Sequence, residues 1–264
     1  MSQYEIILAH IPLLLLVFFR IGGLMIFAPI FGSNIIPVKV RVLFSMLAAL
    51  SVYPLLSDQL LGELHLELSL FTIVPVVALD LLLGVLIGFI ATLPMIAVQT
   101  GGLIMGQQMG LGFARFYNPA VDDEADVIGQ IMFFMLLVGF LLIGGHESLL
   151  LAVLHSFEHI PPGVAFLDMD LIDLLTGLLT ASFELALRVA APLLALVFLQ
   201  SVAMGFVAKT VPQLNILSLG FPLRILVGFG VIGFGLVIIN DVLMDGIDAG
   251  LIALFDWIHT SRPS

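Results

Sequence analysis

Long apolar blocks separated by short polar segments run along the whole chain. The blocks are Ile6–Phe31, Val42–Leu56, Leu70–Val98, Val127–Ile143, Leu171–Ala208 and Leu214–Ile239. A membrane-spanning helix needs about 20 apolar residues, so the second and fourth blocks are short for a span and the fifth is long. The pattern predicts an all-α helical membrane protein, but six simple spans fit it only imperfectly.

Prolines and the C-terminal residues modify this picture. Kinks or breaks are expected where prolines fall inside or at the ends of blocks, at Pro75, Pro94, Pro192 and Pro222. After the last block, Asp241–Trp257 has the spacing of an amphipathic helix. Its expected apolar face consists of Val242, Leu243, Ile247, Leu251, Leu254 and Ile258. Three acidic residues lie off that face, Asp245, Asp248 and Asp256.

The interior segment Gly101–Asp126 differs from the apolar blocks on both sides of it. Its glycines repeat every fourth residue at Gly102, Gly106 and Gly110, a spacing that lets another backbone approach a helix closely. Asn118-Pro119 then interrupts any helix. Two interpretations stay open. The segment is either bent and packed inside protein or against a cavity, where irregular backbone is tolerated at membrane depth, or it is a surface loop.

Composition makes the membrane assignment firm. The chain has 264 residues, of which 61% are hydrophobic and only 10% charged, with a mean hydropathy of +1.24. Soluble domains average about 25% charged residues.

There is no cysteine, which excludes disulfides and thiolate chemistry. The net charge of −11 argues against nucleic acid as a partner. The N-terminus lacks the positive region of a cleaved signal peptide, so we expect a retained first helix.

The few cations predict an orientation. Alternating spans place four of them on one side of the membrane, Lys39, Arg41, Arg115 and Lys209. The positive-inside rule makes that side cytoplasmic. Both termini are then expected on the outer side, with Arg262 as the one exception.

Charges inside apolar blocks are costly in lipid and normally face a partner or a cavity. Glu184 and Arg188 are one helical turn apart, in the favourable order for an ion pair, so mutual pairing is preferred over a transport role. Arg20 and Asp80 can pair with each other or belong to a transport path, and the sequence leaves both open. Arg224 follows Pro222 near the start of the last block.

Three patterns that can carry chemistry lack the context they need. Gly228–Gly233 matches GxGxxG but lies inside an apolar block without a strand–turn–helix unit. His146-Glu147 begins like a zinc-protease motif, but Leu150 occupies the position of the second histidine. His155 and His159 lie near an expected helix end, where hydrogen bonding or solvation is preferred over metal binding. We therefore expect no enzyme activity, cofactor or metal.

Glycines four residues apart recur along the chain and favour close contact between helices. The sets are Gly84/Gly88, Gly102/Gly106/Gly110 and Gly246/Gly250. The contacts can form within the chain or between subunits. Subunit packing is attractive because other chains can cover helices that are too short or too polar for lipid.

Several motifs follow one another through essentially the whole chain. They are FRIGG, API, FG and IPVKVR between residues 19 and 41, GQQMG and YNP between 106 and 119, GGHE at 144–147, SF and P between 156 and 161, and PQLN with GFP between 212 and 222. Together they resemble the FliR family of flagellar type III export-gate proteins. The SctT proteins of injectisomes are relatives, but GLGFARFYNP and PQLN look more flagellar.

The resemblance implies one subunit of a hetero-oligomeric gate in the flagellar basal body, at the bacterial inner membrane. Residues 1–264 would form a single export-gate domain, with a FliP-like part over about 1–170 and a FliQ-like helical hairpin with the C-terminal amphipathic helix over about 171–264. It would be a pore-forming subunit that passes unfolded flagellar subunits and helps to seal the closed channel. Implied partners are FliP and FliQ, FlhB and FlhA, export substrates and membrane lipids.

The resemblance also assigns individual residues. The plug loop would be 106–122, with Gly106, Met109, Gly110, Gly112, Phe113, Phe116, Tyr117, Asn118 and Pro119. Met105 and Met109 suit soft, adaptable packing. The cytoplasmic turn, a subunit contact, would contain Pro212, Gln213 and Asn215. Glu184, Arg188 and Arg224 would contact neighbouring subunits. Because such a gate is raised out of the bilayer plane, apolar blocks need not be true spans.

Two other functions remain as alternatives. In a stand-alone proton-coupled secondary transporter, Arg20, Asp80 and Glu184 would be relay residues around broken helices at the membrane midplane. Against it, the chain has no two halves with matching interrupted segments. A structural membrane scaffold without a pore is the other alternative.

Overall fold

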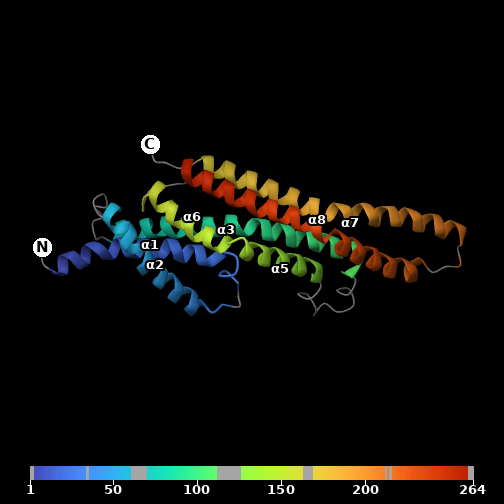
Figure 1. Cartoon of the computed structure of the whole chain (residues 1–264), viewed down its shortest axis with the longest axis horizontal. Helices are drawn as coiled ribbons and strands as arrows, with labels where there is room; N and C mark the ends of the chain where they lie inside the picture. Colours follow the sequence, from blue (N-terminus) through green and yellow to red (C-terminus); the bar gives the residue numbers. More distant parts are fainter. Residues whose placement is uncertain are drawn as a thin grey trace. The chain divides into compact units, whose positions relative to one another are not determined.

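The computed structural model describes residues 3–33, 36–60, 70–111, 126–162, 169–211, 213 and 216–260. Every regular element within these ranges is an α-helix (Figure 1), so the all-α prediction is confirmed. The helices are α1 (Gln3–Phe27), α2 (Val38–Leu60), α3 (Leu70–Met109), α5 (Val127–Leu142), α6 (Gly145–His159), α7 (Met169–Thr210) and α8 (Ile216–Thr260).

Five of these helices are long and apolar enough to cross a membrane, and α5 with α6 adds a sixth crossing if the broken pair counts as one span. Two residues separate α5 from α6, and the second of them, Gly144, has a left-handed φ of 76°. Glycine adopts this conformation without steric cost, which explains why the chain can break at this point.

Several helices extend beyond the blocks predicted from the apolar pattern. Helix α2 has 23 residues, and its candidate span Val38–Leu56 reaches 19 residues because it begins four residues before the second block. Helix α8 has 45 residues and includes Asp241–Trp257, so the predicted amphipathic stretch continues the helix of the last apolar block. The prolines Pro94, Pro192 and Pro222 all lie inside continuous helices. A helix satisfies its own backbone polar groups, which matters more in lipid than the single hydrogen bond that a proline removes.

The chain divides into two compact units, and α3, α5, α7 and α8 contribute residues to both. The first unit comprises Met1–Leu93, Leu141–Leu178 and Ala249–Ser264, and the second comprises Pro94–Phe140 and Leu179–Asp248. The amphipathic face predicted near the end of α8 is confirmed in each unit. Leu243 and Ile247 are buried in the second unit, Leu254 and Ile258 are buried in the first, and Asp245, Asp248 and Asp256 are exposed.

In the first unit, α1 and α3 pack backbone against backbone. A Cβ built on Gly84 would overlap the carbonyl oxygen of Arg20, and one on Gly88 would lie 2.7 Å from the carbonyl oxygen of Leu24. Gly23 of α1 faces α3 in the same way, at the carbonyl of Leu81. The Gly84/Gly88 pair therefore serves packing within the chain. Helix α2 packs on α1, with the rings of Phe31 and Phe44 stacked beyond the end of α1.

In the second unit, α3 meets both α5 and α7 through glycines. A Cβ on Gly102 would lie 2.6 Å from Cα of Gly129 in α5, and one on Gly101 would lie 2.8 Å from the carbonyl oxygen of Ala186 in α7. Asp126 caps α5, because its Oδ1 accepts a hydrogen bond from the amide of Gly129 at 3.0 Å. The close approach predicted for the glycine repeat thus occurs at Gly102, within the chain.

Candidate functional site

The C-terminal end of α3 carries the first residues of the expected plug. The helix continues through Gly101 and ends at Met109. Gly110 then takes a left-handed φ of 88°, and its amide donates to the carbonyl of Gln107 at 3.0 Å. Glycine is the usual residue at a left-handed helix end. The expectation of irregular backbone is therefore wrong for residues 101–109, which are helical, and the helix ends just before Gly110.

The structure covers part of the residues assigned by the resemblance. Gly106, Met109 and Gly110 are described, and Gln213 is an exposed turn residue between α7 and α8. The remaining plug residues and two residues of the expected cytoplasmic turn lie outside the described ranges: Gly112, Phe113, Phe116, Tyr117, Asn118, Pro119, Pro212 and Asn215.

Met109, the residue before the left-handed glycine, packs on the backbone of α8. Its side chain is fully buried, and a Cβ built on Gly228 would lie 2.5 Å from both its Cγ and its Sδ. Gly228 therefore forms a notch that holds the Met109 side chain, and a larger residue at this position would require Met109 to move. Gly228 is the first glycine of the GxGxxG pattern and lies inside helix α8, not in a loop. Its contact with Met109 shows that this glycine is a packing residue. Met105, one turn earlier, is also buried.

Arg20 and Asp80 form a buried ion pair in the first unit. Arg20 Nε donates to Asp80 Oδ1 at 2.7 Å, and Nη2 contacts the same oxygen. Nη1 donates to Ser156 Oγ at 3.2 Å and to the carbonyl of Ile160 at 3.1 Å. The guanidinium carbon lies 4.0 Å from the centroid of the Phe157 ring. One side chain of α1 thus links α3 to the C-terminal end of α6.

The composition of this network indicates a structural role. The Arg20 and Asp80 side chains are 1% and 0% exposed, so both charges are shielded from lipid and from water. Burying two charges is costly unless they pair and their remaining hydrogen-bonding groups are satisfied, as they are here. The sequence suggested the pairing as one of two possibilities. Ser156 and Phe157 appeared in the sequence only as a family motif, and nothing indicated that they or the carbonyl of Ile160 contact Arg20, because only the packing of α6 brings them together.

Glu184 and Arg188 pair with each other on α7. Arg188 Nη2 donates to Glu184 Oε1 at 2.6 Å, and the side chains of Arg188 and Glu184 are 67% and 60% exposed. The predicted i,i+4 ion pair is confirmed. Because the pair is self-satisfied and exposed, it is available to a neighbouring surface but does not depend on one.

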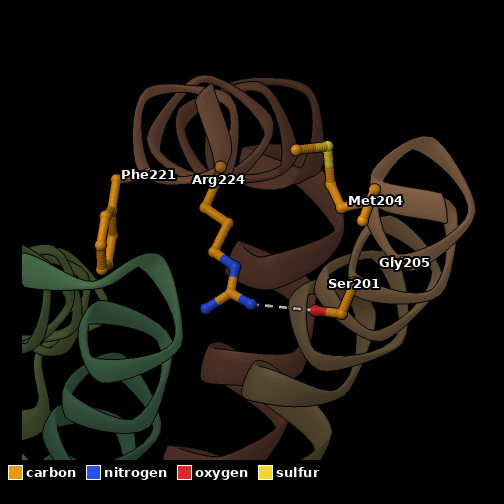
Figure 2. A pocket seen from close by; sticks show the side chains of 7 residues that line it. Ser201, Met204, Gly205, Phe221 and Arg224 are labelled. Atoms are coloured by element: carbon orange, nitrogen blue, oxygen red, sulfur yellow. Dashed lines mark hydrogen bonds between the residues drawn. The ribbon is translucent and has the colours of Figure 1, made fainter. Parts of the chain in front are cut away.

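Arg224 has a different environment from the other intramembrane charges. It extends from α8 toward α7, where its Nη2 donates to Ser201 Oγ at 3.1 Å (Figure 2). The two residues border a pocket of about 370 Å³ that is also lined by Met204, Gly205 and Phe221. The arrangement offers a cation and a hydroxyl beside an otherwise apolar and glycine-lined space.

Histidines lie close together at the C-terminal ends of α6 and α8. Nδ1 of His155 donates to the carbonyl of Leu151 at 2.9 Å, and Nδ1 of His159 donates to the carbonyl of His155 at 3.0 Å. A further hydrogen bond of 3.0 Å joins His259 to His159. The predicted hydrogen-bonded role is confirmed, and within the described residues no three ligand side chains are arranged for a metal. No pattern in the sequence indicated that His259 contacts these histidines.

Comparison with known proteins identifies the family. The family described as "Bacterial export proteins, family 1" matches residues 11–249. The flagellar biosynthetic protein FliR of Bacillus subtilis (strain 168) is 32% identical over 223 residues, which are 83% of this chain and 83% of the relative. The chain belongs to the FliR family of bacterial export proteins. The resemblance seen in the sequence motifs is thereby confirmed.

Other relatives include a second flagellar biosynthetic protein and a Yop proteins translocation protein. FliR of Escherichia coli (strain K12) is 30% identical over 209 residues, covering 79% of this chain and 78% of the relative. Yop proteins translocation protein T of Yersinia pestis is 30% identical over 178 residues, 67% of each chain. The family match includes Arg20, Asp80, Met109 and Arg224, whereas His259 lies beyond it.

Proposed function

We propose that this chain is a pore-forming export-gate subunit of the flagellar type III protein secretion apparatus. The observation that carries the proposal is the FliR-family match over residues 11–249, together with two flagellar FliR relatives. The Yersinia relative, named for translocation of Yop proteins, supports protein export as the shared task. The comparisons lend no support to a stand-alone secondary transporter, and the proposal gives the chain no catalytic role.

In this proposal the chain acts within a hetero-oligomer at the bacterial inner membrane. Residues up to about 170 form a FliP-like part, and residues from about 171 form a FliQ-like hairpin made of α7 and α8. FliP and FliQ are the direct partners, and FlhA and FlhB are further members of the apparatus. The long α7–α8 pair with a short connection supports the hairpin assignment. Exposed aromatic side chains on it, such as Phe198 and Phe206, leave apolar surface for neighbouring chains or lipid.

The gate itself is the segment that follows α3. Met109, packed on Gly228, anchors the start of this segment, and Gly110 redirects the chain out of the helix. The segment seals the pore by dry packing at rest and yields when an unfolded flagellar subunit enters. Substrate thus biases an element with two states, closed and open, by binding only to the open one.

Deletion of Gly110–Pro119 tests the sealing role. Cells that carry the deletion in an otherwise intact apparatus should leak small ions across the inner membrane at rest. A matched control replaces residues 61–69, another connection, with glycine and serine over the same length and should not leak. An unchanged ion leak in the deletion strain, with the assembly recovered at its normal size, would reject the plug.

A further inference from the structure

Three histidine side chains meet where α6 and α8 end. His155 and His159 are one turn apart on α6, and His259 is the last residue but one of α8. The ring centroid of His259 lies 4.6 Å from that of His159 and 6.1 Å from that of His155. All three belong to the first compact unit, although 100 residues separate His159 from His259. The function proposed above assigns them no role.

The hydrogen bonds of this cluster fix which ring nitrogens carry protons. A carbonyl oxygen only accepts, so Nδ1 of His159 must be the donor in its 3.0 Å bond to the carbonyl of His155. In a neutral ring this leaves the lone pair on Nε2. Nδ1 of His259 lies 3.0 Å from this Nε2 and must therefore donate to it. The bond that joins the two helices thus forms between two neutral rings, one with a lone pair and the other with a proton.

Each of the two rings can take up one more proton, but the bond between them tolerates only one. If one ring is charged, it donates to the neutral ring and the bond persists. If both are charged, each facing nitrogen carries a hydrogen, no acceptor remains, and two positive rings lie 4.6 Å apart. A helix C-terminus favours a positive ring, which supports the first charge but does not remove the repulsion between two.

No carboxylate is placed to offset a second charge. Among the described residues, the histidine that lies within 4.0 Å of a carboxylate is His146, at the other end of α6. The charged groups that α1 and α3 bring to the C-terminal end of α6 are Arg20 and Asp80, which pair with each other. The acidic residues that α6, α7 and α8 place nearest to the cluster along the chain are all exposed: Glu158, Asp170, Asp173 and Asp256.

We propose that His155, His159 and His259 form a pH-sensitive latch, which holds the end of α8 on α6 near neutral pH and releases it in acid. Histidine is the side chain whose charge ordinarily changes between about pH 5 and 8. His259 is exposed, so protons from the surrounding solution reach the pair. Leu254 is fully buried one turn before the latch, so the release loosens the last turn of α8 without unfolding the unit. The latch does not require a pore and goes beyond the export function proposed above.

A proton suits this cluster better than a metal ion does. Zinc sites in proteins take at least three protein ligands, and within the described ranges no three side chains are arranged to hold a metal. Nδ1 of His155 donates to the carbonyl of Leu151, and the ring of His155 packs edge-on against Phe255, with centroids 6.0 Å apart. His155 therefore stands beside the pair as a third ring that acid can charge, not as a third ligand.

Hydrogen exchange of the full chain, followed by mass spectrometry, tests the latch. Rates are expressed as protection factors relative to the unfolded chain, which removes the direct effect of pH on exchange. Between about pH 7.5 and about pH 5, the range in which histidine gains its charge, protection of the last turn of α8 should fall about tenfold, because one hydrogen bond is lost and a like-charge contact is gained. Protection around the buried residues Ala152 and Val153 of α6 should stay constant.

Three variants complete the design. His259→Asn keeps an amide donor in place of Nδ1–H but takes up no proton, so it should keep the protection seen at neutral pH and lose the response to acid. His259→Phe removes the donor and should show, at neutral pH, the low protection that the wild type shows in acid. His146→Gln, at the other end of α6, is the matched control and should retain the full response.

Constant protection of the last turn at both pH values would overturn the proposal. An undiminished acid response of His259→Asn would also overturn it, because Asp256, Glu158 or another group would then be responsible. If EDTA lowers protection at neutral pH as acid does, the histidines hold a metal ion. An equal loss around Ala152 would indicate general unfolding in acid. None of these results bears on the ion leak of the Gly110–Pro119 deletion, which tests the export gate.

Discussion

Arg20 and Asp80 are 60 residues apart in the sequence, yet Arg20 Nε lies 2.7 Å from Asp80 Oδ1 in the interior of the first unit. The same guanidinium reaches Ser156 and the carbonyl of Ile160. The Arg20 side chain therefore links α1, α3 and α6. We expect its removal to lower the stability of the fold, and to affect export only as a consequence.

Replacing Asp80 with Asn leaves Arg20 buried without its counter-charge. We expect the free energy of unfolding of the detergent-solubilised chain to fall by about 3–5 kcal/mol, the usual effect of breaking a buried ion pair. Denaturant titration followed by circular dichroism measures it. Glu184→Gln breaks an exposed pair on α7 and should cost no more than about 1 kcal/mol. Equal losses in the two variants would contradict the structural role of the Arg20 network.

Removing both charges should be less harmful than removing one. In the Arg20→Met/Asp80→Leu double variant no unpaired charge remains, and apolar replacement of a buried ion pair is often close to neutral. We expect the double variant to unfold at higher denaturant concentration than Asp80→Asn. If it is the less stable of the two, then the hydrogen bonds to Ser156 and Ile160 contribute more than the charge pairing does.

The crossing of α1 and α3 depends on Gly84. A methyl group there would overlap the carbonyl of Arg20, a backbone atom that cannot move without separating the helices. Gly84→Ala should therefore lower the unfolding free energy by about 1–3 kcal/mol. Gly177→Ala on α7 provides the control, because its Cβ meets nothing within 4 Å, and it should stabilise the helix by up to about 1 kcal/mol. The same Gly→Ala substitution should therefore lower the unfolding free energy at position 84 and raise it at position 177. A loss of similar size at both positions would contradict the close crossing of α1 and α3.

We expect the packing of Met109 on Gly228 to fix the start of the gate segment that follows α3. Gly228→Val should displace the Met109 side chain and raise the resting ion leak of cells with an assembled apparatus. Gly230→Val, two residues further along the same helix, faces open space and should leave the leak unchanged. Adding Met109→Ala to Gly228→Val makes room for the valine, and the two changes should couple in a double-mutant cycle. Additive effects would show that the contact does not control the seal.

The composition of the complex gives an independent check on the proposed function. A tag on this chain should recover, from gently solubilised membranes, one large assembly with two other small hydrophobic proteins in several copies, corresponding to FliP and FliQ. Mass spectrometry of the intact assembly provides the measurement. Recovery of a monomer or homodimer would contradict the export-gate assignment.

Much of the fold could be predicted because lipid imposes a simple rule on sequence. Apolar blocks such as Leu70–Val98 must be helical in lipid, because the α-helix is the regular structure in which one segment forms all of its own backbone hydrogen bonds. The boundaries were less predictable. The glycines at Gly101 and Gly102 suggested irregular backbone, but each costs a helix only about 1 kcal/mol relative to alanine, and close packing on α5 and α7 offsets that cost.

The candidate site was predictable only where contacts are local. The Glu184–Arg188 pair follows from i,i+4 spacing alone. The contact between Met109 and Gly228 joins residues that are far apart in sequence, as do the hydrogen bonds of Ser201 with Arg224 and of His159 with His259. Neither periodicity nor motif matching indicates which helices pack together. These long-range contacts therefore could not be predicted from the separate segments of the sequence.

The sequence by itself determined the helical class, the membrane setting, the family through its ordered motifs, and the local ion pair on α7. These properties depend on apolar length, on composition and on neighbours within one turn. Only the tertiary structure decided that Arg20 meets Asp80 inside the first unit, that Gly228 receives Met109, and that Arg224 borders a space without a carboxylate in the described part of the chain. Such contacts depend on how distant helices pack, and many packings are compatible with the same apolar pattern.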